Sequence, residues 1–175
     1  MIYLDTSVVV ALLTPEERSV QALDWFAESR EPLISSDWLI TETHSALGIK
    51  QRHHGLSSAA RQAAGEQFER LLQGGVELRS LDRDRFRQAA ELLQDSALGL
   101  RAGDALPLAV ALHSICTRLA SFDGRMQPQA ERSHARCTSS AYFLLSCTRW
   151  CSKTPQVVAC SSACVARSLG SCISR

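Results

Sequence analysis

Four acidic residues in this chain have positions from which carboxylates could share a metal ion. Asp5 interrupts the apolar run MIYLDTSVVVALL, and Asp123 follows the segment RLASF. Asp104 lies in LRAGDALPLAVALHS, and Glu42 lies in DWLITETHSALGIKQRH. Carboxylates that converge repel one another unless a cation lies between them. Oxygen ligands without a matching set of His or Cys favour Mg²⁺ or Mn²⁺ over zinc, and such ions promote reactions at phosphoesters.

Each acid also has a purely structural interpretation. Asp5 can cap the helix that follows a short strand, and Asp104 can cap a helix whose start is constrained by Pro107. Glu42, five residues into a predicted helix, is by itself more often a solvated side chain. The metal site therefore depends on whether the fold brings the four acids together.

Hydrophobic patterns predict the elements that position these acids. Strands are expected at residues 2–4, 32–36, 76–81 and 118–122. Helices are expected at residues 8–13, 37–53, 57–72, 82–93 and 106–116. This alternation predicts an α/β fold with a mostly parallel sheet and helices on both faces. Asp5 and Asp123 would then follow strands that end at the same edge of the sheet, where ligands bind in open α/β folds.

The composition is that of one globular domain of ordinary size. The chain has 175 residues, of which 45% are hydrophobic and 21% are charged. The only candidate signal or membrane segment is the start, which lacks a preceding basic region and carries Asp5. We therefore expect a cytoplasmic protein without membrane association.

The character of the chain changes near Ser133. Residues 1–133 hold 14 Lys and Arg against 18 acids, whereas the remainder holds five basic residues and no acid. Six of the seven cysteines also lie in this remainder. We predict a domain at residues 1–132 and an atypical tail at residues 133–175.

Three interpretations of the tail compete. The pairs Cys147 with Cys151 and Cys160 with Cys164 have a spacing compatible with structural zinc. A native Cys-rich extension is the second interpretation, although disulfides would need an oxidising compartment. The third is a segment outside the evolved fold, such as a frameshift product or a fusion scar, and the abrupt loss of acids and periodicity favours it.

The stretches MIYLDTSVVVALL, SDWLITETHSAL, GDALPLAVAL and LASFDGRM resemble the four acidic motifs of PIN-domain nucleases, specifically VapC-type toxins of type II toxin-antitoxin systems. The resemblance covers about residues 1–132. It implies a three-layer α/β/α sandwich with a short, mostly parallel sheet, here followed by the Cys/Ser-rich tail. It also implies a Mg²⁺-dependent endoribonuclease, with Mn²⁺ as an alternative ion, that forms a homodimer and is blocked by a VapB-type antitoxin.

The motifs assign roles to individual residues. By resemblance, Asp5, Glu42, Asp104 and Asp123 form the acidic quartet, in which Asp5 and Asp104 bind the metal most directly. Hydroxyl side chains that resemble the supports of these acids are Thr6, Ser7 and Ser121. Basic residues near the motifs are candidates for contacts with RNA phosphates, namely Lys50, Arg52, Arg101 and Arg125.

The sequence departs from the family pattern at two places. Pro107 follows the third acid and could shift Asp104 by part of a turn, and the segment after Glu131 lacks the expected last edge strand. An alternative function is therefore a catalytically inactive PIN-like module that binds RNA or an antitoxin. A phosphatase of the haloacid dehalogenase type is disfavoured, because Ser7 stands where its DxDxT motif requires a second Asp.

Overall fold

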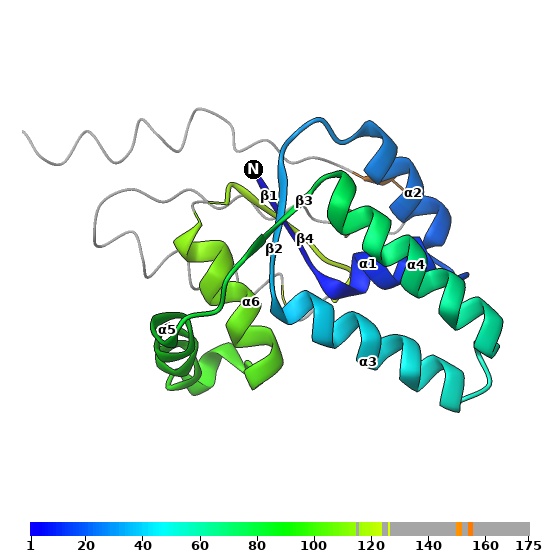
Figure 1. The fold of residues 1–175 in the computed structure, drawn as a ribbon. Helices are drawn as coiled ribbons and strands as arrows, with labels where there is room; N and C mark the ends of the chain where they lie inside the picture. Colours follow the sequence, from blue (N-terminus) through cyan, green and yellow to red (C-terminus); the bar gives the residue numbers. More distant parts are fainter. Residues whose placement is uncertain (115, 124–125, 127–149, 152–153, 156–175) are drawn as a thin grey trace, which may run out of the picture.

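A parallel sheet forms the centre of the molecule in the computed structural model, which describes residues 1–114, 116–123, 126, 150–151 and 154–155. Its four strands have the order β3-β2-β1-β4 (Figure 1). All neighbouring strands pair in parallel, so their carboxyl ends lie along one edge. The strands are β1 (Ile2–Leu4), β2 (Leu33–Ser36), β3 (Val76–Arg79) and β4 (Arg118–Ala120).

Helices cover both faces of this sheet. Figure 1 shows α5 and α6 on one side and α1, α2 and α4 on the other, while α3 extends from the end of β2. The helices are α1 (Thr6–Leu13), α2 (Ser19–Glu28), α3 (Trp38–Arg52), α4 (Ser58–Gly74), α5 (Arg83–Leu93) and α6 (Ala102–His113), with a short 3₁₀ turn at Ser96–Leu98. The predicted three-layer α/β/α architecture is confirmed.

The two sides of the central strand β1 belong to different parts of the core. Ile2 and Leu4 pack in a cluster with residues of α1, α2 and α4, whereas Tyr3 packs with Leu108 of α6. Successive side chains of a strand point to opposite faces, which explains this division. The buried Tyr3 hydroxyl is satisfied by a 3.0 Å hydrogen bond with Ser36 Oγ. A three-residue strand can therefore anchor both layers of helices.

One helix was not predicted from the sequence. Within α2 only Ala22 and Trp25 are buried, while Val20 and Leu23 remain largely exposed. Apolar residues therefore occur on both the buried and the exposed side of α2. The buried face of α2 completes the layer formed by α1 and α4.

The position of α6 corrects the predicted helix at residues 106–116. The helix begins at Ala102 and ends at His113, so Pro107 is its sixth residue rather than a residue of its first turn. Proline has no N–H, and the usual bond to the Gly103 carbonyl cannot form. The buried face of α6 offsets this loss, because every residue from Ala105 to Ala111 is buried.

The strand ends also differ slightly from prediction. β3 ends at Arg79 and β4 ends at Ala120, two residues before the predicted ends at 81 and 122. Asp123 therefore lies in a connecting segment, three residues beyond β4. Asp5 directly follows β1, as predicted.

The predicted tail lies almost wholly outside the described residues. A short antiparallel pair is described there, formed by β5 (Trp150–Cys151) and β6 (Thr154–Pro155). The domain boundary near residue 132 and the zinc alternative at Cys147, Cys151, Cys160 and Cys164 stay predictions. None of the described helices combines the length and apolar character needed to span a bilayer.

Candidate active site

The four predicted acids line one pocket at the carboxyl edge of the sheet. The pocket has a volume of about 290 Å³. Its walls come from α1, α3, the start of α6 and the segment after β4, so each acid is contributed by a different part of the chain. The lining residues are Asp5, Thr6, Ser7, Glu42, Ser45, Ala46, Ile49, Asp104, Asp123 and Met126.

Asp5 combines a structural position with a place in the pocket. It is the N-cap of α1, and its Oδ2 accepts a 3.2 Å hydrogen bond from the Ser7 backbone N–H. The same oxygen accepts hydrogen bonds from the hydroxyls of Ser7 and Ser121, the latter at 2.8 Å. None of these three bonds involves Oδ1. The capping interpretation and the site interpretation of Asp5 are therefore compatible.

The Asp5 carboxyl is held in surroundings that disfavour its charge. Burial raises the pKa of this carboxyl above its ordinary value, and the hydrogen bonds from Ser7 and Ser121 only partly oppose the rise. Desolvation penalises an isolated carboxylate because water can no longer solvate it. A cation in the pocket would relieve this penalty.

Glu42 reaches the pocket from α3 and is fixed by a hydroxyl. Thr6 Oγ1 donates a 2.6 Å hydrogen bond to Glu42 Oε2. The other carboxylate oxygen lies against α6, since a Cβ atom added at Gly103 would be 3.4 Å from Oε1. Burial raises the pKa of Glu42, and the negative charges of Asp5 and Asp104 raise it further. The solvated-surface interpretation of Glu42 therefore does not hold.

Asp104 is the third residue of α6 and not its N-cap. Its Oδ2 accepts a 3.2 Å hydrogen bond from the backbone N–H of Arg101, which is the N-cap residue. This bond satisfies one of the N–H groups at the helix start, and the helix dipole favours a negative charge there. Asp104 thus stabilises the helix terminus while its side chain lines the pocket.

The segment Ser121–Asp123 is tied to the start of α1. The Phe122 backbone N–H donates to Ser7 Oγ at 2.9 Å, and the Asp123 backbone N–H donates to Ser121 Oγ at 3.0 Å. Together with the bond from Ser121 to Asp5, these contacts link the ends of β1 and β4. Ser7 and Ser121 thus lie beside Asp5 and donate hydrogen bonds to its carboxylate, while their predicted role as supporting hydroxyls of the site stays a prediction.

The donor chemistry of the pocket fits a hard divalent cation. All four acids supply carboxylate oxygens, the ligands that Mg²⁺ and Mn²⁺ prefer. Within the described parts of the chain, however, no three His, Cys, Asp or Glu side chains already form a group able to hold an ion. The acids therefore share a pocket without converging on one point, and burial is the largest cause of the raised pKa values of Asp5 and Glu42.

The predicted RNA-binding residues differ in their surroundings. Lys50 forms an ion pair with Glu16, which neutralises its charge. Arg52 at the end of α3 and Arg101 before α6 are exposed. Arg125 lies outside the described residues. Arg101 is adjacent in the chain to the helix that carries Asp104. Of the two exposed arginines, it is therefore the better placed to contact an RNA phosphate at the pocket.

Other residues that line the pocket were not predicted from the sequence. Ser45, Ala46 and Ile49 share the pocket with Glu42, at spacings of three, four and seven residues along α3. This spacing places them on one helix face, so it could have identified them once Glu42 was chosen. Met126 also lines the pocket and is buried, and no local pattern marks it.

Comparison with known protein families shows to which family the chain belongs. The family model described as PIN domain matches residues 2–131. The chain belongs to the PIN-domain family. The match includes all four acids and ends close to the point at which the charge pattern changes. No curated protein matches the chain at a significant level.

Two solved structures resemble this PIN domain. One is VapC20 of Mycobacterium tuberculosis, described as a sarcin-ricin loop cleaving toxin, with a TM-score of 0.61 and 22% identity over 73% of this chain and 94% of that chain. The other is VapBC2 of Rickettsia felis bound to a promoter DNA fragment, with a TM-score of 0.52 and 14% identity over 84% of this chain and 98% of that chain. At these identities the likeness concerns the fold.

Proposed function

We propose that this PIN-domain protein is a metal-dependent endoribonuclease and the toxin of a type II toxin-antitoxin system. The observation that carries the proposal is the single pocket lined by Asp5, Glu42, Asp104 and Asp123. Four carboxylates in one partly buried pocket destabilise a metal-free fold, and they are useful chiefly as ligands of a cation. The toxin assignment is supported by the likeness to VapC20 and VapBC2.

In the proposed site the acids would bind the metal ion, and the hydroxyls would orient the acids. Asp5 and Asp104, assisted by Glu42 and Asp123, would hold Mg²⁺ or Mn²⁺. When bound, such an ion supplies an activated water and stabilises negative charge on the phosphate. Thr6 holds Glu42, while Ser7 and Ser121 hold Asp5. These hydroxyls fix the direction of the carboxylates before the ion and RNA bind, which reduces the reorganisation that binding requires.

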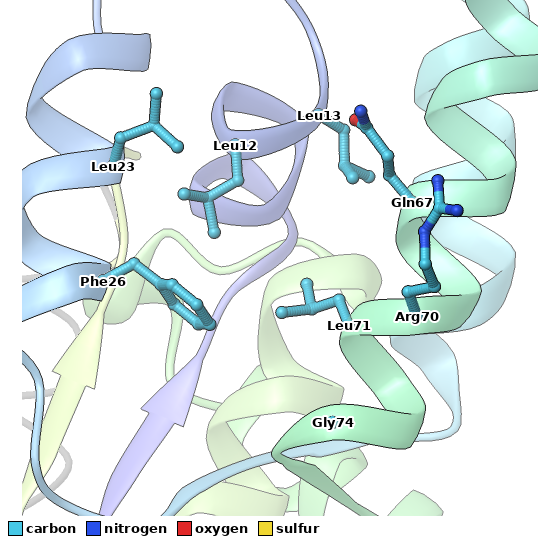
Figure 2. A pocket seen from close by; sticks show the side chains of 8 residues that line it. All are labelled: Leu12, Leu13, Leu23, Phe26, Gln67, Arg70, Leu71 and Gly74. Atoms are coloured by element: carbon cyan, nitrogen blue, oxygen red, sulfur yellow. The ribbon is translucent and has the colours of Figure 1, made fainter.

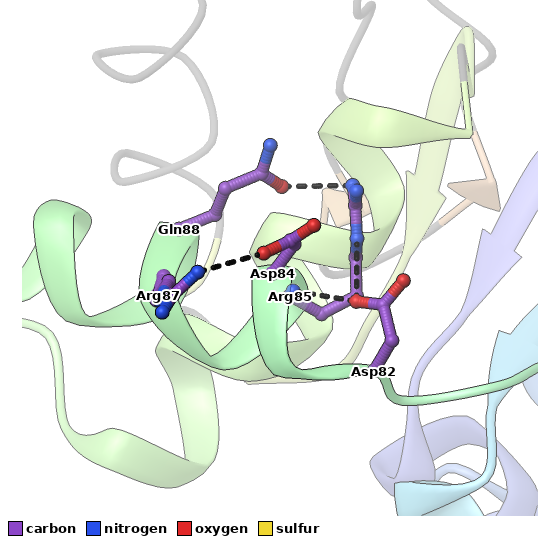
Figure 3. Close-up of polar contacts among 5 residues, drawn as sticks. All are labelled: Asp82, Asp84, Arg85, Arg87 and Gln88. Carbon is purple, nitrogen blue, oxygen red and sulfur yellow. Dashed lines mark hydrogen bonds and ion pairs between the residues drawn. The ribbon is translucent and has the colours of Figure 1, made fainter.

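RNA would approach the pocket along the side of Arg101. Phosphate contacts need cations that are not already neutralised. Two basic residues of α5 fail this requirement, because Arg85 pairs with Asp82 at 3.4 Å and Arg87 pairs with Asp84 at 3.2 Å (Figure 3). Lys50 is likewise paired with Glu16. No ion pair of Arg101 or Arg52 is found among the described contacts, and these two arginines are the proposed phosphate contacts, together with Arg125.

A VapB-type antitoxin is the proposed protein partner. A second pocket of about 360 Å³ lies between α1, α2 and α4, away from the acids (Figure 2). Leucines and Phe26 form most of its wall, with Arg70 and Gln67 on one side. Such a wall suits an apolar segment that carries an acidic residue. A VapB-type antitoxin is the proposed source of that segment. The predicted homodimer stays a prediction.

Cleavage of RNA by the purified protein tests the proposed activity. A fluorogenic single-stranded RNA is incubated with protein that has been stripped of metal, and Mg²⁺, Mn²⁺ or Zn²⁺ is then added separately. We expect cleavage with Mg²⁺ or Mn²⁺ and loss of cleavage in EDTA. Activity that survives chelation, or that only Zn²⁺ restores, would contradict the proposal. Intact RNA in all conditions, with the antitoxin still bound, would support the inactive binding module.

A further inference from the structure

An arginine outside the acidic motifs contacts the segment that carries Asp123. Arg18 Nη1 donates a 3.0 Å hydrogen bond to the backbone carbonyl of Phe122. The guanidinium carbon of Arg18 also lies 5.2 Å from the centroid of the Phe122 ring. A cation over an aromatic face is attracted by the negative charge of the ring face. One side chain therefore holds both the backbone and the ring of Phe122.

The position of this contact matters because of the peptide unit that it involves. The Phe122 carbonyl and the Asp123 N–H belong to the same planar peptide group. Arg18 binds the carbonyl of this group at 3.0 Å, and Ser121 Oγ accepts a hydrogen bond from its N–H at 3.0 Å. A peptide plane held at both ends cannot rotate freely. The direction in which Asp123 leaves the backbone is thereby restrained.

Arg18 is itself held by an ordered connection between α1 and α2. Ser19 Oγ donates to the Thr14 carbonyl at 2.6 Å and accepts from the Glu16 N–H at 2.8 Å. The Glu16 carboxylate pairs with Lys50 of α3, the helix that carries Glu42. The connection at residues 14–19 thus contacts both the Asp123 segment and α3.

We infer that Arg18 is a positioning residue, which orients the Phe122–Asp123 peptide so that the Asp123 carboxylate faces the metal pocket. This inference rests on the proposed function, since it assumes that the pocket binds a divalent cation. Arg18 acts through Asp123, because it is not among the residues that line the pocket of the four acids. The connection between α1 and α2 thereby helps to orient Asp123 in the pocket.

Substitution of Arg18 tests the inference with two measurements on the full chain. Arg18→Gln removes the cation and the guanidinium, whereas Arg18→Lys keeps a cation and an N–H donor. Arg30→Gln is the matched control, because Arg30 is also exposed but lies just before β2, at the opposite edge of the sheet. Hydrogen exchange of the peptide spanning residues 119–123 is measured without metal. Mn²⁺ affinity is measured from the paramagnetic resonance of free Mn²⁺.

We expect faster exchange at residues 119–123 in Arg18→Gln and an increase of about fivefold in the Mn²⁺ dissociation constant, the effect of losing one ordinary hydrogen bond. Arg18→Lys should fall between Arg18→Gln and the wild type, and Arg30→Gln should match the wild type. If Arg18→Gln does not fold, Arg18→Lys is judged by the same two measurements.

Two results would overturn the inference. Unchanged exchange and Mn²⁺ affinity in Arg18→Gln would show that Arg18 does not position Asp123, even if the KM for RNA rose through a lost phosphate contact. An equal effect of Arg30→Gln would show that the loss reflects net charge alone. Wild-type protein that binds no Mn²⁺ would instead contradict the proposed function, so the two failures are distinguishable.

Discussion

The hydrogen bond from Thr6 to Glu42 gives a quantitative prediction about the site. Thr6→Val keeps the shape of the side chain but removes the hydroxyl that donates to Glu42 Oε2 at 2.6 Å. This distance is typical of a short bond between a hydroxyl and a charged carboxylate, which is stronger than a bond between neutral groups. The bond holds one carboxylate oxygen while Oε1 lies near Gly103 at the start of α6.

The expected magnitude follows from the strength of that bond. Hydrogen bonds to charged groups contribute about 1.5–3 kcal/mol, and partial exposure of this pair places it near the lower value. A loss of about 1.5 kcal/mol corresponds to roughly a tenfold rise in a dissociation constant. We therefore expect Thr6→Val to weaken Mn²⁺ binding about tenfold, because the freed Glu42 must be reoriented when the ion binds.

The assay is isothermal titration calorimetry, in which Mn²⁺ is added to metal-free protein. Thr41→Val is the matched control, since Thr41 is an exposed neighbour of Glu42 on α3 and no described hydrogen bond involves its side chain. Equal Mn²⁺ affinity in Thr6→Val and the wild type would show that the Thr6 hydroxyl does not orient Glu42 for metal binding. Equal weakening by Thr41→Val would show that the effect is not due to the bond from Thr6.

Three further predictions concern stability. Because the folded pKa values of Asp5 and Glu42 are raised above their ordinary values of 3.8 and 4.5, the contribution of these two carboxyls to the stability of metal-free protein should be fully present below those ordinary values and should be lost as pH rises through the folded pKa values. Asp5→Asn with Glu42→Gln should flatten that decline in thermal melts over pH 4–8, and an unchanged slope would contradict the assigned burial. Gly99→Ala should lower the free energy of unfolding by about 1 kcal/mol in urea titrations, because φ at Gly99 is +60° and favours glycine; no loss would show that the turn relaxes. Truncation after Arg132 should leave melting and cleavage nearly unchanged, whereas a drop of several kcal/mol in unfolding free energy would show that the tail packs on the domain.

The sequence predicted the sheet and the acids because their signals are local. Ile2–Leu4 forms an apolar strand followed at once by Asp5, and alternating elements require parallel strands whose carboxyl ends share an edge. The helix starts predicted at residues 57 and 82 are equally local, since the N-caps Ser57 and Asp82 accept hydrogen bonds from the backbone N–H groups of Ala60 and Arg85. Order along the chain was therefore sufficient to expect Asp5 and Asp123 at one edge of the sheet, whereas Glu42 and Asp104 were assigned to the same site by the resemblance of their motifs.

Features that depend on distant residues were not predictable in this way. Pro107 suggested a later helix start, yet burial of the remaining α6 residues outweighs the one hydrogen bond that proline removes. The contact between Arg18 and Phe122 joins residues 104 positions apart. The pairing of Lys50 with Glu16, which neutralises a predicted RNA contact, likewise depends on how α3 packs beside the α1–α2 connection.

The assignment of the pocket as the active site is tested most directly by measuring Mn²⁺ binding and RNA cleavage in the same samples of wild type, Asp5→Asn and Asp104→Asn. Both substitutions retain shape and remove one carboxylate charge from the pocket. We expect wild-type cleavage to be half-maximal at the Mn²⁺ concentration that half-saturates the site. We also expect each variant to lose most Mn²⁺ binding and most cleavage while remaining folded in EDTA. Folded variants that cleave RNA at the wild-type rate would contradict the assignment of this pocket as the active site.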